Sequence, residues 1–479
     1  LEEQAKYLIY YFYFRDEKII EELEVKKNRK VLSKILVDSF HSNYFKKIKN
    51  EIVNPLLMSP SQEKLSFINS LKGEYIKSGP SGAPTRGKTE VLPTGKNFFS
   101  IDSRGLPTEA AWYMGDLSAN NLLELYKQEN GEDLKKIAVS IWATSTMRNG
   151  GEDICQVLSL MGVKPIWDGV SRRVVDLEVI PVKILLRPRV DVTLRISGMF
   201  RDSFPQLINL VAKAIDLVAN LNEESEYNSL ADYRRNAQDI YRIFGSAPGS
   251  YGAGLQELIS NSNWKDIHDL ANAYLAWSSW SYDINNEGLL SKNEFNSILK
   301  DIQVVIHNQD NKEHDILDSD DYYQFQGGIS AAIKSISGEY PKIYNGDFSK
   351  YSKPKVKKLK DEIDKVVISR VLNPKWIEGM KKNGYKGAFE FSATLDYLYA
   401  YDATTSLVSN WNYESIYTTW LCDKQLIEFF ENNNPWALRD ISERFLEIIN
   451  REMWTNISDK NKENLMNILI RAESQIENK

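Results

Sequence analysis

The chain has 479 residues, 42% of them hydrophobic and 26% charged, which is the composition of a globular protein of roughly three domains. Its formal charge of -6 lacks the basic excess of a phosphate-backbone binder, so we expect no nucleic-acid partner. The apolar runs fall short of the ~20 residues that cross a bilayer, and two cysteines exclude a disulfide framework. We therefore expect a cytoplasmic protein with no membrane span.

The first 95 residues are predicted to form a helical segment that ends in a loop. Helices are expected over residues 1–52 and 61–75, and residues 78–93 are rich in Gly, Pro, Ser and Thr. Within this loop, residues 82–89 match the phosphate-binding pattern G-x-x-x-x-G-K-[ST]. No buried strand precedes the match and no helix follows it, so we expect an extended loop that binds no ATP.

Residues 96–222 are predicted to form a doubly wound α/β domain. A helix begins near Glu109, where Thr108 precedes the acidic residue in the manner of a helix cap. Apolar runs and helical periodicity then alternate, with strands expected at 137–142, 163–167, 174–180 and 190–196 and helices at 152–161 and 204–218.

Ligands of doubly wound sheets bind at the carboxyl ends of the strands. Two polar segments follow predicted strands, residues 143–151 and 197–202. They contain Arg148 and Arg201, which we expect to lie at the same edge of the sheet.

Residues 223–479 are predicted to form a mainly helical domain with one strand at 342–344, so the fold class is α/β plus mostly α. Residues 249–254 lead into a helix and could hold a carboxylate at its N-terminus or form a plain turn. Residues 283–294 nearly fit a calcium-binding EF-hand loop, but Glu287 stands where Asp or Asn is required. The alternative is an acidic surface loop between helices.

The densest group of chemically active side chains lies in residues 305–325. His307 and His314 are two of only four histidines, and they are surrounded by carboxylates and tyrosines. Imidazole together with carboxylate suits Co, Ni, Zn or Mn, and the same groups accept protons as general bases. The alternative is a solvated acidic loop with the tyrosines packed beneath it.

The motifs GPSGAPTRG (79–87), ISGMFRD (196–202) and HDILDSDDYY (314–323), with others given below, resemble those of a known family. This family contains the large subunit of aerobic cobaltochelatase (CobN) and its sister, the porphyrin-binding H subunit of magnesium chelatase. The resemblance runs in continuous order from about residue 60 to the C-terminus. The segment HDILDSDDYY at residues 314–323 is more similar to the cobalt branch than to the magnesium branch. The other matching motifs are LPTGKNF (92–98), IWATS (141–145), MR (147–148), RPRVDVT (187–193), YGAG (251–254), NPKW (373–376) and GYKG (384–387).

The resemblance implies the large-subunit segment of an ATP-dependent chelatase, a ligase that forms nitrogen–metal bonds by inserting divalent cobalt into a corrin-type tetrapyrrole in cobalamin biosynthesis. It implies AAA+ partner subunits that use the ATP. Family members are longer, and this chain corresponds to their C-terminal part without the upstream His-Gly-x-Leu-Glu motif. We therefore expect a subunit that is inactive alone and needs the upstream part. The alternatives are a magnesium or nickel chelatase subunit, or a non-catalytic tetrapyrrole-binding or scaffold half-subunit.

Such a reaction needs groups that strip water from the metal, accept two pyrrole protons and hold a flat polycarboxylate ring. By the resemblance, we expect His314 and Asp318 to be catalytic and to point inward, with one of Asp320 or Asp321 outward. The expected metal-binding residues are His307, His314, Asp315, Asp318, Asp320 and Asp321. Arginines can bind the carboxylates of the ring, and aromatic side chains can pack against its faces. The expected substrate-binding residues are Trp142, Arg148, Arg195, Arg201, Tyr251, Tyr322 and Lys375.

Overall fold

The computed structural model describes residues 47–82, 84, 89–99, 102–351 and 353–477. The chain divides into two compact units, Leu1–Phe99 and Ser100–Lys479. Among the described residues, no helix is both long enough and apolar enough to cross a membrane.

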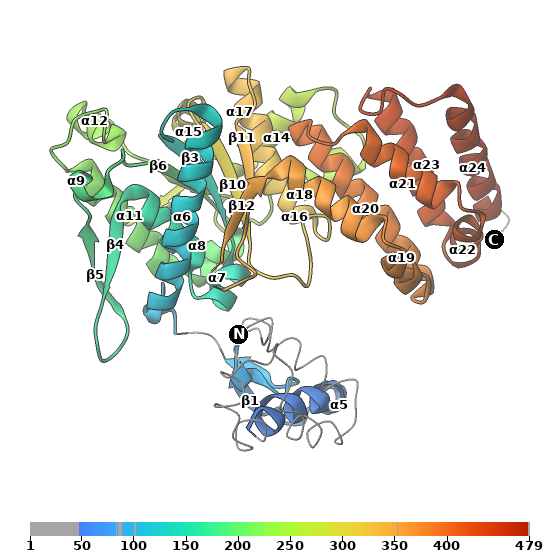
Figure 1. The fold of residues 1–479 in the computed structure, drawn as a ribbon, viewed down its shortest axis with the longest axis horizontal. Helices are drawn as coiled ribbons and strands as arrows, with labels where there is room; N and C mark the ends of the chain where they lie inside the picture. Colours follow the sequence, from blue (N-terminus) through green and yellow to red (C-terminus); the bar gives the residue numbers. More distant parts are fainter. Residues whose placement is uncertain (1–46, 83, 85–88, 100–101, 352, 478–479) are drawn as a thin grey trace, which may run out of the picture. The chain divides into compact units, whose positions relative to one another are not determined.

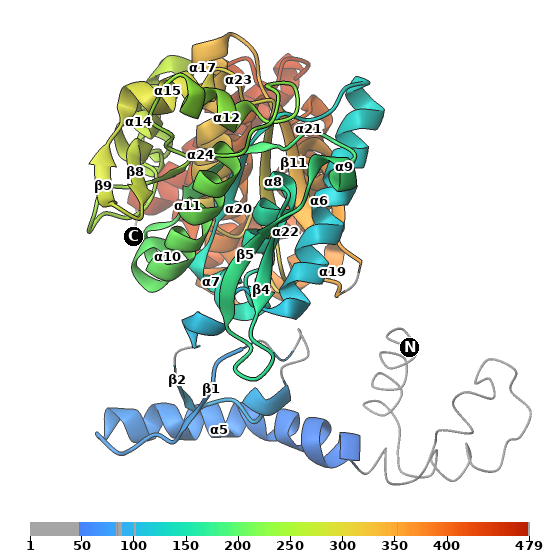
Figure 2. The same cartoon turned by 90° about the vertical axis from the view of Figure 1, so that its left-hand side faces the viewer.

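The first unit is built around helix α5 (Asn54–Leu71), which follows the π-helical turn η1 (Lys49–Val53) (Figure 2). A short parallel pair of strands, β1 (Ser78–Pro80) and β2 (Asn97–Phe99), accompanies the helix. The backbone N–H of Thr94 donates to the Ser59 hydroxyl at 3.0 Å, which ties the segment before β2 to α5.

Two predictions for the first unit fall largely outside the described residues. The first is the set of helices expected before residue 47. The second is the extended loop expected at the phosphate-loop-like match, residues 82–89, of which five of the eight residues are not described. The last residue of that match, Thr89, begins a three-residue 3-10 turn, η3 (Thr89–Val91), rather than an α-helix. The second predicted helix begins earlier than expected, at Asn54, and ends at Leu71.

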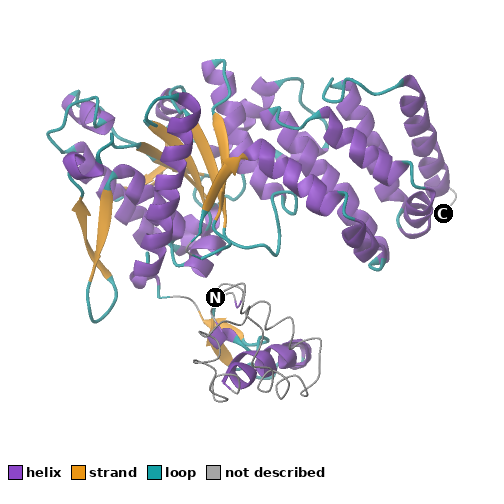
Figure 3. Cartoon of the chain, in the orientation of Figure 1, coloured by secondary structure: helices purple, strands orange, loops and turns teal. Residues whose placement is uncertain are grey.

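The second unit contains one sheet of eight strands in the order β12-β11-β10-β3-β6-β7-β8-β9 (Figures 1 and 3). The five strands in the centre of the sheet are parallel, and the outer strands pair antiparallel with their neighbours. The central strands are buried on both faces, which agrees with their nearly continuous apolar sequences. The strands are β3 (Lys136–Ile141), β6 (Asp191–Ile196), β7 (Ile243–Gly245), β8 (Trp280–Asp283), β9 (Asn286–Leu290), β10 (Val304–Gln309), β11 (Lys342–Asp347) and β12 (Lys355–Lys358).

Three helices cover one face of the sheet (Figure 1). Their apolar side chains pack against those of the strands and form a hydrophobic core. The longest begins where the sequence predicts, because the Thr108 hydroxyl accepts a hydrogen bond from the N–H of Ala111 at 3.1 Å. It ends at Gly131, which adopts the left-handed conformation that glycine accepts without strain. The three helices are α6 (Glu109–Asn130), α8 (Glu152–Met161) and α11 (Pro205–Ala219).

The other face of the sheet packs against a larger helical region, which shares a second core with it. Residues from both the sheet and the C-terminal helices contribute to this core, so the helical region is continuous with the α/β region. The fold class predicted from the sequence is confirmed. The helices are α14 (Ile267–Ser278), α15 (Lys292–Leu299), α17 (Gly328–Ser337), α18 (Leu359–Val366), α19 (Pro374–Lys381), α20 (Gly384–Thr405), α21 (Asn410–Leu421), α22 (Lys424–Asn433), α23 (Pro435–Asn450) and α24 (Asp459–Glu477).

The sheet differs from the prediction in its extent. Six of its eight strands come after residue 222, where the sequence analysis ended the α/β domain. The strands expected at 163–167 and 174–180 are formed, as β4 (Val163–Trp167) and β5 (Val174–Val179), but they pair only with each other in a separate hairpin. Residues 283–286, the start of the EF-hand-like segment, close the β8–β9 hairpin and do not connect two helices.

The order of the strands creates a switch point at the centre of the sheet. From β3 the chain moves outward through β6 and β7, and it then returns to place β10 on the other side of β3. The connections that leave β3 and β10 at their carboxyl ends therefore diverge. In open α/β sheets this divergence opens a crevice in which ligands bind.

Candidate functional site

A small polar cavity of about 60 Å³ lies at the carboxyl ends of β3 and β10, at the switch point of the sheet. Its wall is made by the segment after β3, by the end of β10 and by the loop that follows β10. The lining residues are Trp142, Thr144, Ser145, Arg148, His307, Asn308, Gln309, Asp310, Ser319, Asp321 and Tyr322.

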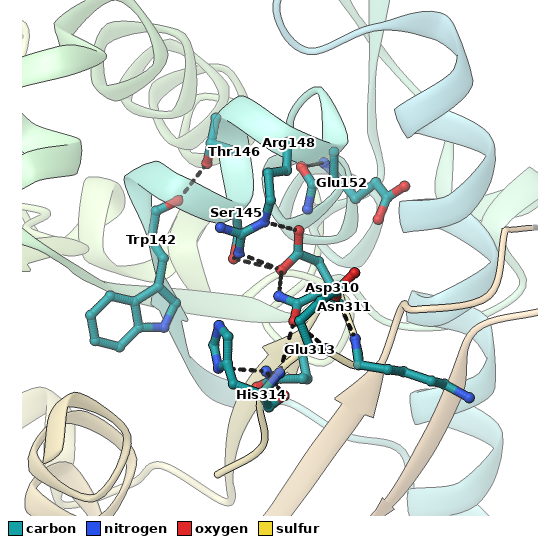
Figure 4. A network of polar contacts seen from close by, with 12 residues as sticks. Trp142, Ser145, Thr146, Arg148, Glu152, Asp310, Asn311, Glu313 and His314 are labelled. Atoms are coloured by element: carbon teal, nitrogen blue, oxygen red, sulfur yellow. Dashed lines mark hydrogen bonds and ion pairs between the residues drawn. The ribbon is translucent and has the colours of Figure 1, made fainter. Parts of the chain in front are cut away.

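An arginine–aspartate pair forms one wall of the cavity. Arg148 lies on the short helix α7 (Ala143–Asn149), and its Nε and Nη2 atoms donate to the two oxygens of Asp310 at 2.9 and 2.7 Å (Figure 4). Ser145 and Asn311 also donate to the Asp310 carboxylate, at 3.3 and 3.0 Å. Burial opposes the charge of Arg148, but the hydrogen bonds and charge of Asp310 leave the pKa of Arg148 above its usual value.

A histidine–tryptophan pair forms the adjoining wall. The indole Nε1–H of Trp142 donates to Nδ1 of His307 at 3.1 Å, and Nε2 of His307 lies 3.4 Å from Oε1 of Gln309. Because Nδ1 accepts, the ring proton is on Nε2 and points toward Gln309. Burial lowers the pKa of His307 to about 4, so its imidazole is neutral near pH 7.

Gln309 connects this wall to a second histidine. Its Nε2 donates to the backbone carbonyl of His314 at 3.0 Å, and the hydroxyl of Tyr322 lies 2.8 Å from Nδ1 of His314. The rings of His314 and Tyr322 stack with centroids 5.7 Å apart. Burial raises the pKa of Tyr322 to about 12, so this hydroxyl keeps its proton. His314 therefore lies behind Tyr322 and does not line the cavity itself.

Two of the predicted metal-binding carboxylates are held by an arginine. Arg370 lies on the π-helical turn η6 (Val367–Val371), and its Nη2 donates to Asp315 Oδ1 at 2.8 Å. Its Nη1 lies 2.9 Å from Asp318 Oδ1. Asp318 also accepts the backbone N–H of Asp315 at 2.7 Å. These contacts favour a structural role for both carboxylates, whereas the sequence analysis expected Asp318 to point into the site.

The last two carboxylates open the short helix α16 (Asp320–Tyr322). Asp320 accepts a hydrogen bond from Gln324 at 2.9 Å, whereas Asp321 lines the cavity. Asp321 is an exposed residue, but partial loss of water around its carboxyl group, together with the charge of Asp320, raises its pKa. The sequence analysis expected one of these two carboxylates to point outward, and the structure gives them different contacts.

The six predicted metal-binding residues are distributed over several settings instead of forming one cluster. His307 and Asp321 line the cavity, His314 lies behind Tyr322, and Asp315 and Asp318 surround Arg370. Within the described ranges, no three His, Cys, Asp or Glu side chains are placed to hold one metal ion. The predicted metal-binding residues therefore do not form one ligand set among the described residues.

Two of the predicted ring-binding arginines donate hydrogen bonds to backbone carbonyl groups. Arg195 of β6 is fully buried, donates through Nη2 to the carbonyl of Gly252 at 3.0 Å, and has its pKa lowered by that burial. Arg201, on α10 (Gly198–Ser203), donates to the carbonyls of Ala247 and Ser250 at 2.7 and 3.1 Å. Both guanidinium groups thus hold the loop after β7.

The predicted ring-binding residues Tyr251 and Lys375 lie outside the cavity wall. Tyr251 is 59% exposed, and its hydroxyl donates to Asp202 at 2.7 Å. The ring lies directly over Gly198, where a Cβ would approach it to 2.6 Å. Lys375 is an exposed residue near the start of α19. Arg148 and Arg201 do follow neighbouring parallel strands at one edge of the sheet, as predicted, but only Arg148 lines the cavity.

Comparison with known proteins agrees with this architecture. A model of the family described as CobN/Magnesium Chelatase matches residues 2–461. The chain belongs to this family.

The chain is similar to curated proteins from both branches of the CobN/magnesium chelatase family. The chain is 46% identical over 427 residues to the aerobic cobaltochelatase subunit CobN of Pseudomonas aeruginosa, covering 85% of the chain and 34% of that protein. It is 31% identical to the magnesium-chelatase subunit ChlH of Oryza sativa subsp. japonica, covering 85% of the chain and 30% of that protein. The chain thus spans about a third of the length of these curated relatives.

A solved structure of the family has the same fold. The catalytic subunit of cobaltochelatase from Mycobacterium tuberculosis superposes with a TM-score of 0.89 at 38% identity, covering 95% of this chain and 40% of that chain. The two chains therefore share the fold described above over nearly the whole of this chain.

Several residues of the cavity were not singled out from the sequence. Asn308, Gln309 and Asp310 directly follow the apolar part of β10, and a polar run at the end of a buried strand is a signal that could have identified them. Asn308 points to the opposite face from His307 and donates to Asp153 of α8 at 2.7 Å. Arg370 gave no local signal, because its contacts with Asp315 and Asp318 join distant parts of the chain.

Proposed function

We propose that this chain is a segment of the large subunit of an ATP-dependent cobaltochelatase, a ligase that inserts divalent cobalt into a corrin-type tetrapyrrole in cobalamin biosynthesis. The observation that carries the proposal is a polar cavity at the switch point of the sheet, in a chain 46% identical to a CobN subunit. ATP is used by AAA+ partner subunits, and cobalt is a substrate.

The size of the cavity limits what it does in this reaction. A volume of about 60 Å³ is far below the roughly 300–1,000 Å³ of pockets that enclose drug-sized ligands. The cavity therefore accepts protons or a single ion while the ring lies across its mouth. Of the predicted ring-binding residues, Trp142, Arg148 and Tyr322 are at this place, and they are our candidates for contact with the ring.

Insertion of a metal displaces two pyrrole protons, so the site needs a proton acceptor. Asp321 is the best candidate, because it lines the cavity and its raised pKa brings it closer to neutral pH. His307 is a less suitable candidate, because both of its ring nitrogens already have hydrogen-bond partners. His314 acts through Tyr322, whose hydroxyl it holds.

The test is to replace Asp321 by Asn in the full-length subunit and to assay it with its ATPase partners, Co²⁺ and a metal-free corrin-type ring. We expect kcat for insertion to fall by about 10²- to 10⁴-fold, the usual contribution of a general base, while the Kd for the ring changes little. Asp361→Asn, an exposed change on α18, is the matched control and keeps the wild-type rate. An Asp321→Asn enzyme with the wild-type rate would contradict the role of this carboxylate.

A magnesium chelatase subunit is the second candidate, because the chain is also 31% identical to a ChlH subunit. The same assay distinguishes the two when Co²⁺ with a corrin-type ring is compared with Mg²⁺ and a metal-free porphyrin. Binding of the ring without insertion of either metal would instead identify a non-catalytic tetrapyrrole-binding subunit.

A further inference from the structure

The loop between β10 and α16 carries His314 and ends beside Asp321, so its conformation decides where both side chains lie. The loop has little regular structure of its own. Turns stabilise it locally, since the side chain of Asn311 accepts the N–H of Glu313 at 3.1 Å and Asp315 accepts the N–H of Leu317 at 2.9 Å. Such turns fix only neighbouring residues. Ile316 and Leu317 anchor the middle of the loop, because both are buried in the core that the sheet shares with the C-terminal helices.

Arg370 adds a polar attachment to this loop from a distant part of the chain. Its two Nη atoms contact Asp315 at 2.8 Å and Asp318 at 2.9 Å, so one guanidinium group holds both ends of a short turn. The guanidinium is itself restrained, because Nη1 lies 3.4 Å from the Thr394 hydroxyl of α20 and the ring of Trp376 lies 5.5 Å away. The side chain of Arg370 is only 15% exposed.

The charges at this contact depend on one another. Asp315 and Asp318 are three residues apart, and their side chains are 24% and 28% exposed. Without the cation, two partly buried carboxylates would repel each other and would lose their counter-charge, which is a costly state. The contact is also one that arginine makes and lysine does not, since a planar guanidinium can reach two carboxylates at once whereas an ammonium is a single point charge.

We infer that Arg370 is the positioning residue of this site: by pairing with Asp315 and Asp318 it holds the loop after β10, so that Tyr322 and Asp321 face the cavity. Arg370 does not touch the substrate and acts only through the loop. The kinetic part of this inference rests on the function proposed above, whereas the structural part does not.

The structural part is tested by hydrogen–deuterium exchange of the full chain. Arg370→Met removes the charge at similar length, and we expect peptides from residues 311–322 to exchange at least about tenfold faster, because the ion pairs no longer hold the loop. Adding Asp315→Asn and Asp318→Asn to this variant removes the unpaired carboxylates, and part of the lost protection returns. Unchanged exchange of this segment in Arg370→Met would overturn the inference.

The kinetic part uses the full-length subunit in the insertion assay. We expect Arg370→Met to lower kcat by about 100-fold, the effect of a misplacement near 1 Å, with the Kd for the ring unchanged. Arg370→Lys recovers only a fraction of the rate. The matched control is Arg439→Met, since Arg439 pairs with Asp440 on α23 and has no contact with the loop.

The two proposals fail in different ways. If the wild-type subunit inserts no metal into any ring, the proposed function fails, but the exchange of residues 311–322 still decides the role of Arg370. If the wild-type inserts metal and Arg370→Met does so at the same rate, the positioning role is overturned and the proposed function stands.

Discussion

At the scale of single residues, His307 shows how burial turns an imidazole into a neutral hydrogen-bonding group. Its pKa of about 4 lies below the usual value near 6.5 because water is excluded. Between these two values the unfolded chain binds a proton that the folded chain does not. The free energy of unfolding therefore falls by up to about 3 kcal/mol as the pH drops from 6.5 to 4.

The measurement is urea unfolding of the wild-type protein and of His307→Gln across this pH range. We expect the wild-type to lose more stability than the variant as the pH falls, because glutamine does not titrate. Between pH 7 and 9 the difference between the two proteins stays constant, which serves as the internal control. Equal losses on acidification would show that this imidazole is not the buried neutral group described.

The residues of the site show which chemistry a sequence can reveal. Trp142 and Tyr322 were expected to contact the ring and His307 to bind metal, and all three line the one cavity at the carboxyl ends of β3 and β10. The carboxylate that pairs with Arg148 was not foreseen, since Asp310 looks like any acidic loop residue until β10 is placed beside β3. Partners across strands follow from the order of the sheet, which local patterns do not contain.

At the scale of elements, a glycine sets how closely α19 and α20 approach. A Cβ on Gly387 would lie 1.9 Å from the carbonyl oxygen of Met380, far inside a normal contact. Gly379, in the middle of α19, has no atom within 4 Å of such a Cβ. Glycine is therefore required at the first position but not at the second.

This contrast gives a matched pair of variants. We expect Gly387→Ala to lower the free energy of unfolding by about 1–3 kcal/mol, because α20 has to move away from the end of α19. Gly379→Ala is expected to stabilise the protein by up to about 1 kcal/mol, because alanine favours the helix. Chemical denaturation of both variants checks the prediction. If both changed stability by the same amount, the close approach would have no energetic importance.

The elements also show why some predictions from the sequence were confirmed and others were wrong. The start of α6 was predicted because Thr108 and Glu109 form a local capping signal. The strands β4 and β5 were found as elements, but they were assigned to the wrong sheet. Their apolar alternation indicates a strand and says nothing about which strand becomes its partner.

At the scale of the whole molecule, the sheet joins two regions that the sequence analysis divided at residue 222. β3 lies between β6 and β10, and β6 lies between β3 and β7. A buried ion pair also crosses this boundary, since Arg242 contacts Asp191 at 2.6 Å and both side chains are at most 3% exposed. A chain that stops at residue 222 would leave Asp191 buried without its counter-charge.

We therefore expect residues 100–479 to unfold in a single transition, whereas residues 100–222 alone do not fold cooperatively. Two central strands of the fragment would each lack a neighbour, and one face of its sheet would be uncovered. Thermal unfolding followed by circular dichroism compares the two proteins. A sharp transition with native helix content in the short fragment would show that it is an independent domain.

The alternation of side chains along β10 has a consequence for how this protein can evolve. His307 points toward Trp142 on one face of the sheet, and its neighbour Asn308 points toward Asp153 on the other. Gain or loss of one residue inside Val304–Gln309 would exchange these two surroundings, which leaves each polar group among the wrong partners. During evolution, residues of β10 can therefore be substituted, but insertions and deletions have to occur in the loop that follows the strand.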